Sequence, residues 1–236
     1  MYEWISSLSR QLNFCESEEG RVEVLQSLIS SFGFEFFCFS IRSAIPFINP
    51  KTRIFGSYPV DWAERYLNIY HARDSELFIK YSKSSLLVIW DHVSMATVDV
   101  ALSEEAIGHG LRYGCTLKVR DFTNSFLTLS VARPTTAITL SEEQELGIKL
   151  RVLIEVFGEY MNIRQDGVSG ARETLLTERE RQILQWTAEG KSSAEVAMIL
   201  SICTDTVNYH LNNVKNKLGV TNKTSAVAYG VALGLI

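Results

Sequence analysis

One face of a helix near the C-terminus carries side chains that can read DNA bases. The segment from Thr204 or Asp205 to Leu218 has apolar residues at helical spacing: Val207, Leu211, Val214 and Leu218. The opposite face carries Asn208, Tyr209, Asn212, Asn213, Lys215 and Asn216. Asparagine can bond adenine through N6 and N7, and lysine reaches phosphates or guanine. This face therefore suits base reading.

The elements around this helix form a helical domain with clear starts and stops. Capping boxes begin at Thr177 and at Ser192, Gly190 ends the first helix, and Asn222 can cap a last helix that runs to about Leu233. A short helix that ends near Leu200, a tight turn and a longer helix match a helix-turn-helix. Many helical bundles share this spacing, so a bundle with a merely solvated outer face stays open on pattern alone.

The charge of the chain is unevenly distributed. The net charge is −4, but residues 171–236 hold seven Lys or Arg against six Asp or Glu. Residues 206–236 hold three lysines and no acid, which makes this end the plausible phosphate-facing surface. No apolar run approaches the roughly 18 residues of a membrane span, and the first ten residues lack a secretion signal. We therefore expect a cytoplasmic protein.

Neither an enzyme nor a metal centre is indicated by the residues that could do such chemistry. The four histidines, His71, His92, His109 and His210, are scattered, and the chain has no nucleophile elbow, P-loop or H-E-x-x-H. The four cysteines, Cys15, Cys38, Cys115 and Cys203, form no C-x-x-C pair and are best interpreted as small apolar residues. We predict no enzyme, no cofactor and no metal.

The rest of the chain predicts an α+β domain. Strands are expected at 34–41, 52–57, 86–90, 115–120 and 125–132, and helices at 22–32, 61–70 and 141–161. The last of these would open with a capping box at Ser141. An α/β/α sandwich with an antiparallel sheet would bury the apolar faces of these strands and helices. The polar, glycine-containing stretch 164–173 would link this domain (1–163) to an all-α helix-turn-helix domain (174–236).

The C-terminal segment closely resembles the DNA-binding domain of the LuxR family of quorum-sensing regulators. Family signature residues fall on Glu180, Leu184 and Gly190 and on the run Thr206–His210. At Cys203 the family has a better capping residue, so the third helix is expected to start one residue later. The resemblance implies a homodimer that binds a two-fold symmetric site on double-stranded DNA, with RNA polymerase as a candidate partner. The DNA-binding residues would be Lys191, Ser192, Thr206, Asn208, Tyr209, Asn212, Asn213, Lys215 and Lys217.

The N-terminal domain resembles the autoinducer-binding domain of the same family, on GFEFFCFSIR, Pro46-Phe47, Pro50-Lys51 and SYPVDWAERY. This resemblance implies a small-molecule autoinducer, an N-acyl homoserine lactone, bound between sheet and helices. Trp62 would donate to the lactone carbonyl, and Tyr58 and Ser130 would bond the amide carbonyl. Tyr66 and Trp90 would form walls, and Gly114 matches a family glycine. The acyl tail would lie among Ile41, Leu117 and Leu129.

The carboxylate of the family site is displaced in this chain. The family has an Asp-Pro pair nine residues after the tyrosine matched by Tyr66, where this chain has Ser75 and Glu76. Either the loop shifts by one residue and Asp74 accepts the ligand amide N–H, or that contact is lost. The segment 94–102 also lacks the aromatic residue common in the family. A ligand-independent regulator, or one with a different ligand, therefore remains open, and without the resemblance Trp62, Tyr66 and Trp90 would be core aromatics.

A phosphorylated response regulator shares this type of C-terminal domain, but it is disfavoured. Residues 1–163 lack the acidic cluster and the parallel β/α alternation expected of its receiver. The direction of regulation, activation or repression, stays open.

Overall fold

A computed structural model describes residues 2–59, 61–62, 87–97, 100–121, 124–163 and 176–236. The chain forms two compact units. The first comprises Met1–Arg42, Thr52–Asp121 and Phe126–Met161, and the second comprises Ser43–Lys51, Phe122–Ser125 and Asn162–Ile236. The whole predicted linker 164–173 falls outside the described residues, so the domain boundaries stay predictions.

The first unit is built on a five-stranded antiparallel sheet, which confirms the predicted α+β class. Its strands are β1 (Phe36–Arg42), β2 (Thr52–Gly56), β3 (Leu87–Asp91), β4 (Tyr113–Arg120) and β5 (Phe126–Arg133). Their order in the sheet is β2-β1-β5-β4-β3, and every neighbouring pair is antiparallel. The five strands lie where the sequence predicts them.

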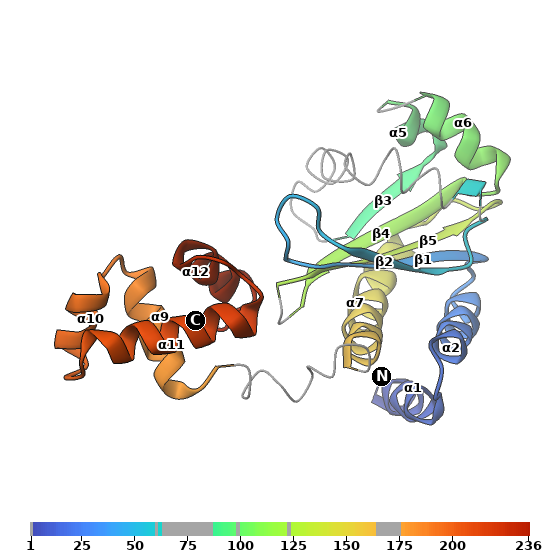
Figure 1. Ribbon diagram of the computed structural model, residues 1–236. Coiled ribbons are helices and arrows are strands. Elements are labelled where there is room, and N and C mark those ends of the chain that lie inside the picture. Colours follow the sequence, from blue (N-terminus) through green and yellow to red (C-terminus); the bar gives the residue numbers. More distant parts are fainter. Residues whose placement is uncertain (1, 60, 63–86, 98–99, 122–123, 164–175) are drawn as a thin grey trace. The chain divides into compact units, whose positions relative to one another are not determined.

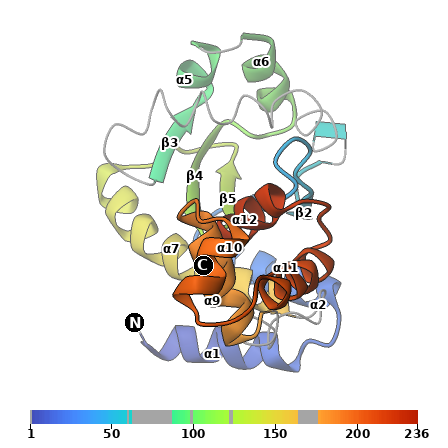
Figure 2. The same cartoon turned by 60° about the vertical axis from the view of Figure 1, so that its left-hand side comes forward.

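Helices cover both faces of this sheet (Figures 1 and 2). They are α1 (Tyr2–Phe14), α2 (Glu18–Ser31), α5 (His92–Ala96), α6 (Val100–Gly108) and α7 (Leu140–Ile163). One face packs against α1, α2 and α7 in a cluster that includes Phe37, Leu117, Leu129 and Phe157. The other face contributes Ala132 and Trp90 to a smaller cluster with α5 and α6. The sequence analysis missed α1, α5 and α6.

The start of α7 corrects one predicted cap. The reciprocal capping bonds join Thr139 and Glu142, not Ser141 and Gln144. The Thr139 backbone N–H donates to Glu142 Oε2 at 2.9 Å, and the Glu142 N–H donates to Thr139 Oγ1 at 3.3 Å. Glu142 also accepts from the buried Arg133 guanidinium, which ties the end of β5 to α7. This tertiary partner favours the earlier start.

The second unit holds four helices in its described part: α9 (Glu178–Ala188), α10 (Ser193–Ile199), α11 (Thr204–Leu218) and α12 (Lys223–Ala232). The capping boxes at Thr177 and Ser192 are confirmed, as are the stops at Gly190 and Gly219, both with positive φ. Asn222 caps α12 through the Ser225 N–H. The helix-turn-helix is therefore α10 and α11.

The predicted later start of α11 is wrong. Cys203 is the N-cap, in an extended conformation, although its side chain makes no capping hydrogen bond. The Val207 N–H bonds the Cys203 carbonyl, and Val207 is fully buried, so packing of the first turn fixes the start despite the weak cap. Tertiary contacts here override a local signal.

Candidate ligand pocket and nucleic-acid interface

An aromatic cluster lies on the sheet face that α5 and α6 cover. Trp62 is 4% exposed and joins Ala106, Leu111 and Ala132. Four partly buried side chains pack against these residues: Phe36, Tyr58, Trp90 and Met95. The structure thus brings together three of the predicted ligand-binding residues, Tyr58, Trp62 and Trp90, with aromatic walls and polar tips. Such a lining suits a ligand with an apolar tail and a polar head.

Gly114 makes room for the Trp90 ring. The two residues are cross-strand partners on β4 and β3. A Cβ atom at Gly114 would lie 2.3 Å from Trp90 Cζ2 and 2.4 Å from the Val131 carbonyl oxygen. The indole ring therefore occupies space that a side chain at position 114 would need.

A hydrogen-bond chain runs across three strands from Trp90 to Ser130. Trp90 Nε1 donates to Thr116 Oγ1 at 3.0 Å, and Thr116 Oγ1 lies 2.9 Å from Ser130 Oγ. Ser130 is 8% exposed. Sequence analysis missed Thr116. The register of the sheet could have identified it. Thr116 follows Gly114 by two residues on β4, so it lies on the same face, and it pairs with Ser130 of β5.

The structure does not bring the residues predicted for the acyl tail together with Trp90 and Ser130. Ile41, Leu117 and Leu129 belong to the cluster with α1, α2 and α7. Successive strand residues point to opposite faces, so Leu117 and Leu129 point away from their neighbours Thr116 and Ser130. A tail that shares the face of Ser130 would instead meet Phe36, Leu111 and Ala132.

Three predicted ligand contacts, Tyr66, Asp74 and Ser75, lie outside the described residues. The choice between Asp74 and Ser75 therefore stays as the sequence leaves it.

At the end of β3, the Asp91 carboxylate caps α5. It accepts the Ser94 backbone N–H at 2.8 Å, and this hydrogen bond lowers the pKa of the Asp91 carboxyl.

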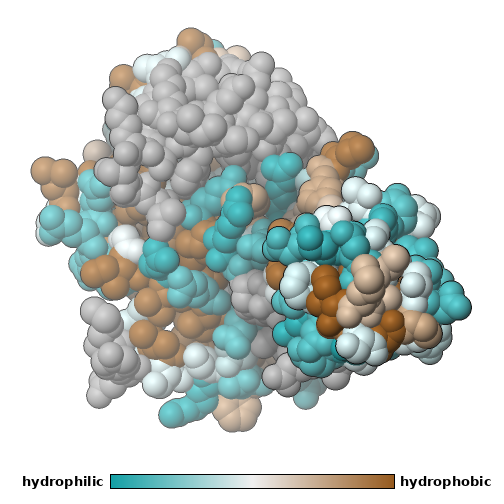
Figure 3. Space-filling model, turned by 90° about the vertical axis from the view of Figure 1, so that its left-hand side faces the viewer, coloured by the Kyte–Doolittle hydropathy of each residue, from teal (hydrophilic) through white to brown (hydrophobic). Residues whose placement is uncertain are grey.

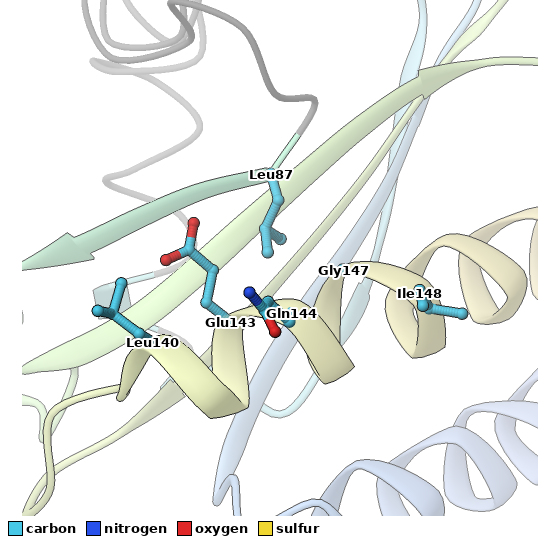
Figure 4. A pocket seen from close by; sticks show the side chains of 6 residues that line it. All are labelled: Leu87, Leu140, Glu143, Gln144, Gly147 and Ile148. Carbon is cyan, nitrogen blue, oxygen red and sulfur yellow. The ribbon is translucent and has the colours of Figure 1, made fainter.

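A surface pocket of about 340 Å³ lies on the other side of the sheet (Figure 4). It is lined by Leu87 of β3 and by residues of α7: Leu140, Glu143, Gln144, Gly147 and Ile148. Tyr58, Trp62, Trp90 and Ser130, the predicted ligand-binding residues that the structure describes, do not line it.

The outward face of α11 matches the predicted base-reading face. Val207, Leu211 and Val214 are buried, whereas Tyr209 is 62% exposed. Asn208 and Asn212 are exposed too, and Thr206, Asn213 and Lys215 are half-buried. Figure 3 shows that the C-terminal unit is mostly hydrophilic on the side facing the viewer, with a small apolar patch. The exposed amides thus lie on a surface that water, or DNA, can reach.

Two predicted DNA-binding side chains also serve the unit itself. Ser192 Oγ donates to Glu195 Oε2 at 2.7 Å within the capping box of α10. Lys217 Nζ donates to Glu180 Oε2 at 2.7 Å. Burial pushes the pKa of Glu180 up, but the hydrogen bonds from Lys217 and Thr177 outweigh it and hold that pKa below its usual value. Lys191, next to Ser192, is half-buried at the start of the helix-turn-helix.

Two negative findings apply to the described ranges only. No helix there is long and apolar enough to cross a membrane. No group of three or more His, Cys, Asp or Glu residues there is arranged to hold a metal ion.

Two family models match this chain. Residues 17–160 match the autoinducer binding domain, and residues 174–229 match the bacterial regulatory proteins of the luxR family. The quorum-sensing regulator RhlR of Pseudomonas aeruginosa is 38% identical over 234 residues, covering 99% of this chain and 96% of RhlR. The regulatory protein SdiA of Escherichia coli is 31% identical over 242 residues, covering 100% and 98%.

A crystal structure of Escherichia coli SdiA has the same fold. It superposes with a TM-score of 0.84 at 28% identity, covering 100% of this chain and 98% of that one. A small-molecule-binding sheet unit followed by a helix-turn-helix unit defines a ligand-responsive transcription regulator, and not an enzyme. The chain belongs to the LuxR family of quorum-sensing transcriptional regulators.

Proposed function

We propose that the ligand is an N-acyl homoserine lactone bound on the α5 and α6 face of the sheet. The observation that carries this proposal is the cluster of Tyr58, Trp62 and Trp90 beside the buried Ser130 hydroxyl. In this proposal Trp62 bonds the lactone carbonyl, and Tyr58 and Ser130 bond the amide carbonyl. Tyr66 and Trp90 form walls, and Asp74 or, in the ungapped alignment, Ser75 meets the amide N–H.

The regulator then acts on DNA as a homodimer in the cytoplasm. The exposed amides of α11 would read bases in the major groove, and Lys191 and Lys215 would contact phosphates. Dimers of helix-turn-helix proteins place their recognition helices about 34 Å apart, or a multiple of it, so the proposed site is two-fold symmetric. RNA polymerase is the partner expected of an activator.

A different ligand is the second candidate. One solved structure is of SdiA in complex with octanoyl-rac-glycerol, at 28% identity and a TM-score of 0.78. An acylglycerol shares the acyl tail and ester carbonyl of a lactone but lacks the amide. The displaced carboxylate at Asp74 favours this alternative, because Ser75 and Glu76 stand where the family pair is expected.

Mass spectrometry of the co-purifying ligand tests the proposal. The protein is expressed in cells with and without lactone synthesis and then denatured. A lactone recovered at near one equivalent supports the proposal. An acylglycerol, or no small molecule in either host, contradicts lactone sensing.

Substitutions at the amide contact test the binding mode. A charge-assisted hydrogen bond to a buried amide contributes about 1.5–3 kcal/mol. Asp74→Asn should therefore weaken lactone binding roughly 10- to 150-fold in a thermal-shift titration. Trp62→Phe keeps the wall, removes the donor and should also lose affinity while the domain stays folded. Ser75→Ala is the control: if it alone weakens binding, Ser75 and not Asp74 makes the contact.

A further inference from the structure

The first turn of α9 contacts α11 near its C-terminal end through a buried carboxylate. Glu180 is 3% exposed, and its Oε2 accepts both the Lys217 ammonium and the Thr177 backbone N–H, each at 2.7 Å. The Lys217 side chain is 35% exposed. Glu180 therefore belongs at once to the capping box of α9 and to an ion pair with the last turn of α11.

The residue before Glu180 contacts the turn at the other end of α11. Arg179 Nη2 donates to the Leu200 carbonyl at 3.1 Å, and Arg179 Nη1 donates to Gln182 Oε1 at 3.2 Å. Leu200 is the C-cap of α10, and Ser201 after it has a φ of 53°, in the left-handed region that non-glycine residues rarely adopt. Arg179 thus holds the carbonyl next to a turn residue of the helix-turn-helix that has a left-handed backbone conformation.

Apolar packing holds α11 against α9 in two clusters. Its first half packs through Val207 and Leu211 on Ile183, and its second half packs through Val214 on Leu184. The hydrophobic effect is non-directional, whereas hydrogen bonds with charged groups are short and directional. The polar contacts at the two ends therefore add directional constraints on the angle and register of the helix.

Lys215 and Lys217 differ in where they point. Residues two apart in a helix lie about 200° apart around its axis, so the two lysines flank the buried stripe on opposite sides. Lys217 is paired with Glu180. No hydrogen bond or ion pair joins the Lys215 ammonium to another described residue, which leaves its charge for a phosphate.

We propose that Arg179, Glu180 and Lys217 form a clamp that positions the recognition helix, and that Lys217 serves this clamp rather than a DNA phosphate. The proposal rests on the proposed reading of DNA by α11. It adds three positioning residues, two of which lie on a different helix from the reading face.

The salt dependence of DNA binding separates the two roles of a lysine. The logarithm of the binding constant K falls as the logarithm of the salt concentration rises, and each lost phosphate contact reduces the magnitude of this slope by about 0.9. The full-length protein is titrated from low to moderate salt with a duplex that the wild type has selected from random sequence, and with a random duplex. Lys215→Met should lower the slope by about 0.9 per contact. Lys217→Met should leave the slope unchanged and reduce the ratio of selected to random affinity about tenfold.

Two further variants keep the test decisive if Lys217→Met fails to fold. Glu180→Gln removes the buried charge without touching the DNA-facing surface, and it should lower the same ratio. Lys217→Arg keeps an ion pair with Glu180 and should retain the ratio. A slope for Lys217→Met that falls as far as that of Lys215→Met, or a wild-type ratio for Glu180→Gln, overturns the clamp.

Asn212→Ala shows whether the underlying function holds. It should lower the ratio and leave the slope unchanged, because an amide on the reading face carries no charge. If Asn212→Ala changes nothing, α11 does not read DNA and the clamp falls with it. If Asn212→Ala lowers the ratio while Glu180→Gln does not, only the clamp is wrong.

Discussion

At the scale of single residues, the ligand face of the sheet is organised by one hydroxyl. Thr116 Oγ1 accepts the Trp90 indole N–H, so its own proton can go to Ser130. A hydroxyl that receives a hydrogen bond keeps its own proton to donate. In this arrangement Ser130 presents a donor, which suits the carbonyl oxygen of the proposed ligand.

Replacing Thr116 by valine should disrupt this chain without changing the shape of the site. A neutral hydrogen bond contributes about 0.5–1.5 kcal/mol, so Thr116→Val should weaken lactone binding roughly two- to tenfold. The Trp90 indole N–H resonance of the ligand-free protein should also shift, as read from a ¹H–¹⁵N spectrum. Thr116→Ser keeps the hydroxyl and is the control. Unchanged affinity and an unmoved Trp90 resonance in Thr116→Val would show that the chain has no role.

Only some side chains on the ligand face of the sheet can be predicted from the sequence. Tyr58, Trp62, Trp90 and Ser130 are predicted as ligand contacts because their positions resemble a family pattern. Thr116 was missed because its partners are 26 and 14 residues away and meet it only through strand pairing. Such contacts carry no local signal.

At the scale of elements, local signals succeed where a few adjacent residues complete the structure. The capping boxes at Thr177 and Ser192 need only four residues each, and both form as predicted. The face of a strand is different. Helices cover both sides of this sheet, so β1 is buried on both faces and alternation cannot tell them apart. The sequence therefore could not show that Leu117 and Leu129, predicted to line the acyl tail, lie on the opposite face from Ser130.

The close pairing of β3 and β4 should not tolerate a side chain at position 114. The alanine Cβ would overlap Trp90 Cζ2 and the Val131 carbonyl, so Gly114→Ala should lower the free energy of unfolding by about 1–3 kcal/mol. Chemical denaturation measures this loss. Gly147→Ala is the matched control in α7. Its nearest neighbour, Leu87 Cδ2, lies 3.7 Å away, and alanine favours a helix over glycine by about 1 kcal/mol. Equal effects of the two substitutions would contradict the close approach.

The start of α11 lacks a side-chain cap, so a capping residue at position 203 should stabilise the helix. Cys203 makes no side-chain capping bond, and the Thr206 hydroxyl, 2.9 Å from its Sγ, lowers the pKa of its thiol. A serine N-cap stabilises a helix by about 1 kcal/mol relative to a residue that cannot cap. Cys203→Ser should therefore raise the free energy of unfolding by up to about 1 kcal/mol. Cys203→Ala should give no gain, and a gain as large as that of serine would show that capping is not the cause.

At the scale of the whole molecule, the two units divide the work of a regulator. The sheet unit gathers the proposed ligand contacts, and the helical unit exposes the proposed base-reading face. The fold class of both units follows from the sequence, because strand patterns mixed with helical ones occur before residues 164–173 and only helical periodicity follows them. How ligand binding changes DNA affinity is a coupling free energy between the units.

The most direct test of the central claim measures that coupling. Fluorescence anisotropy follows the binding of the wild-type protein to a two-fold symmetric duplex, selected from random sequence, across a panel of lactones with short and long chains. Couplings of this kind typically change affinity about 5- to 150-fold. We predict that at least one lactone tightens or weakens binding within this range, while octanoyl-glycerol and a random duplex show no such change. If no lactone alters the affinity for the selected duplex, the protein is not a lactone-responsive regulator.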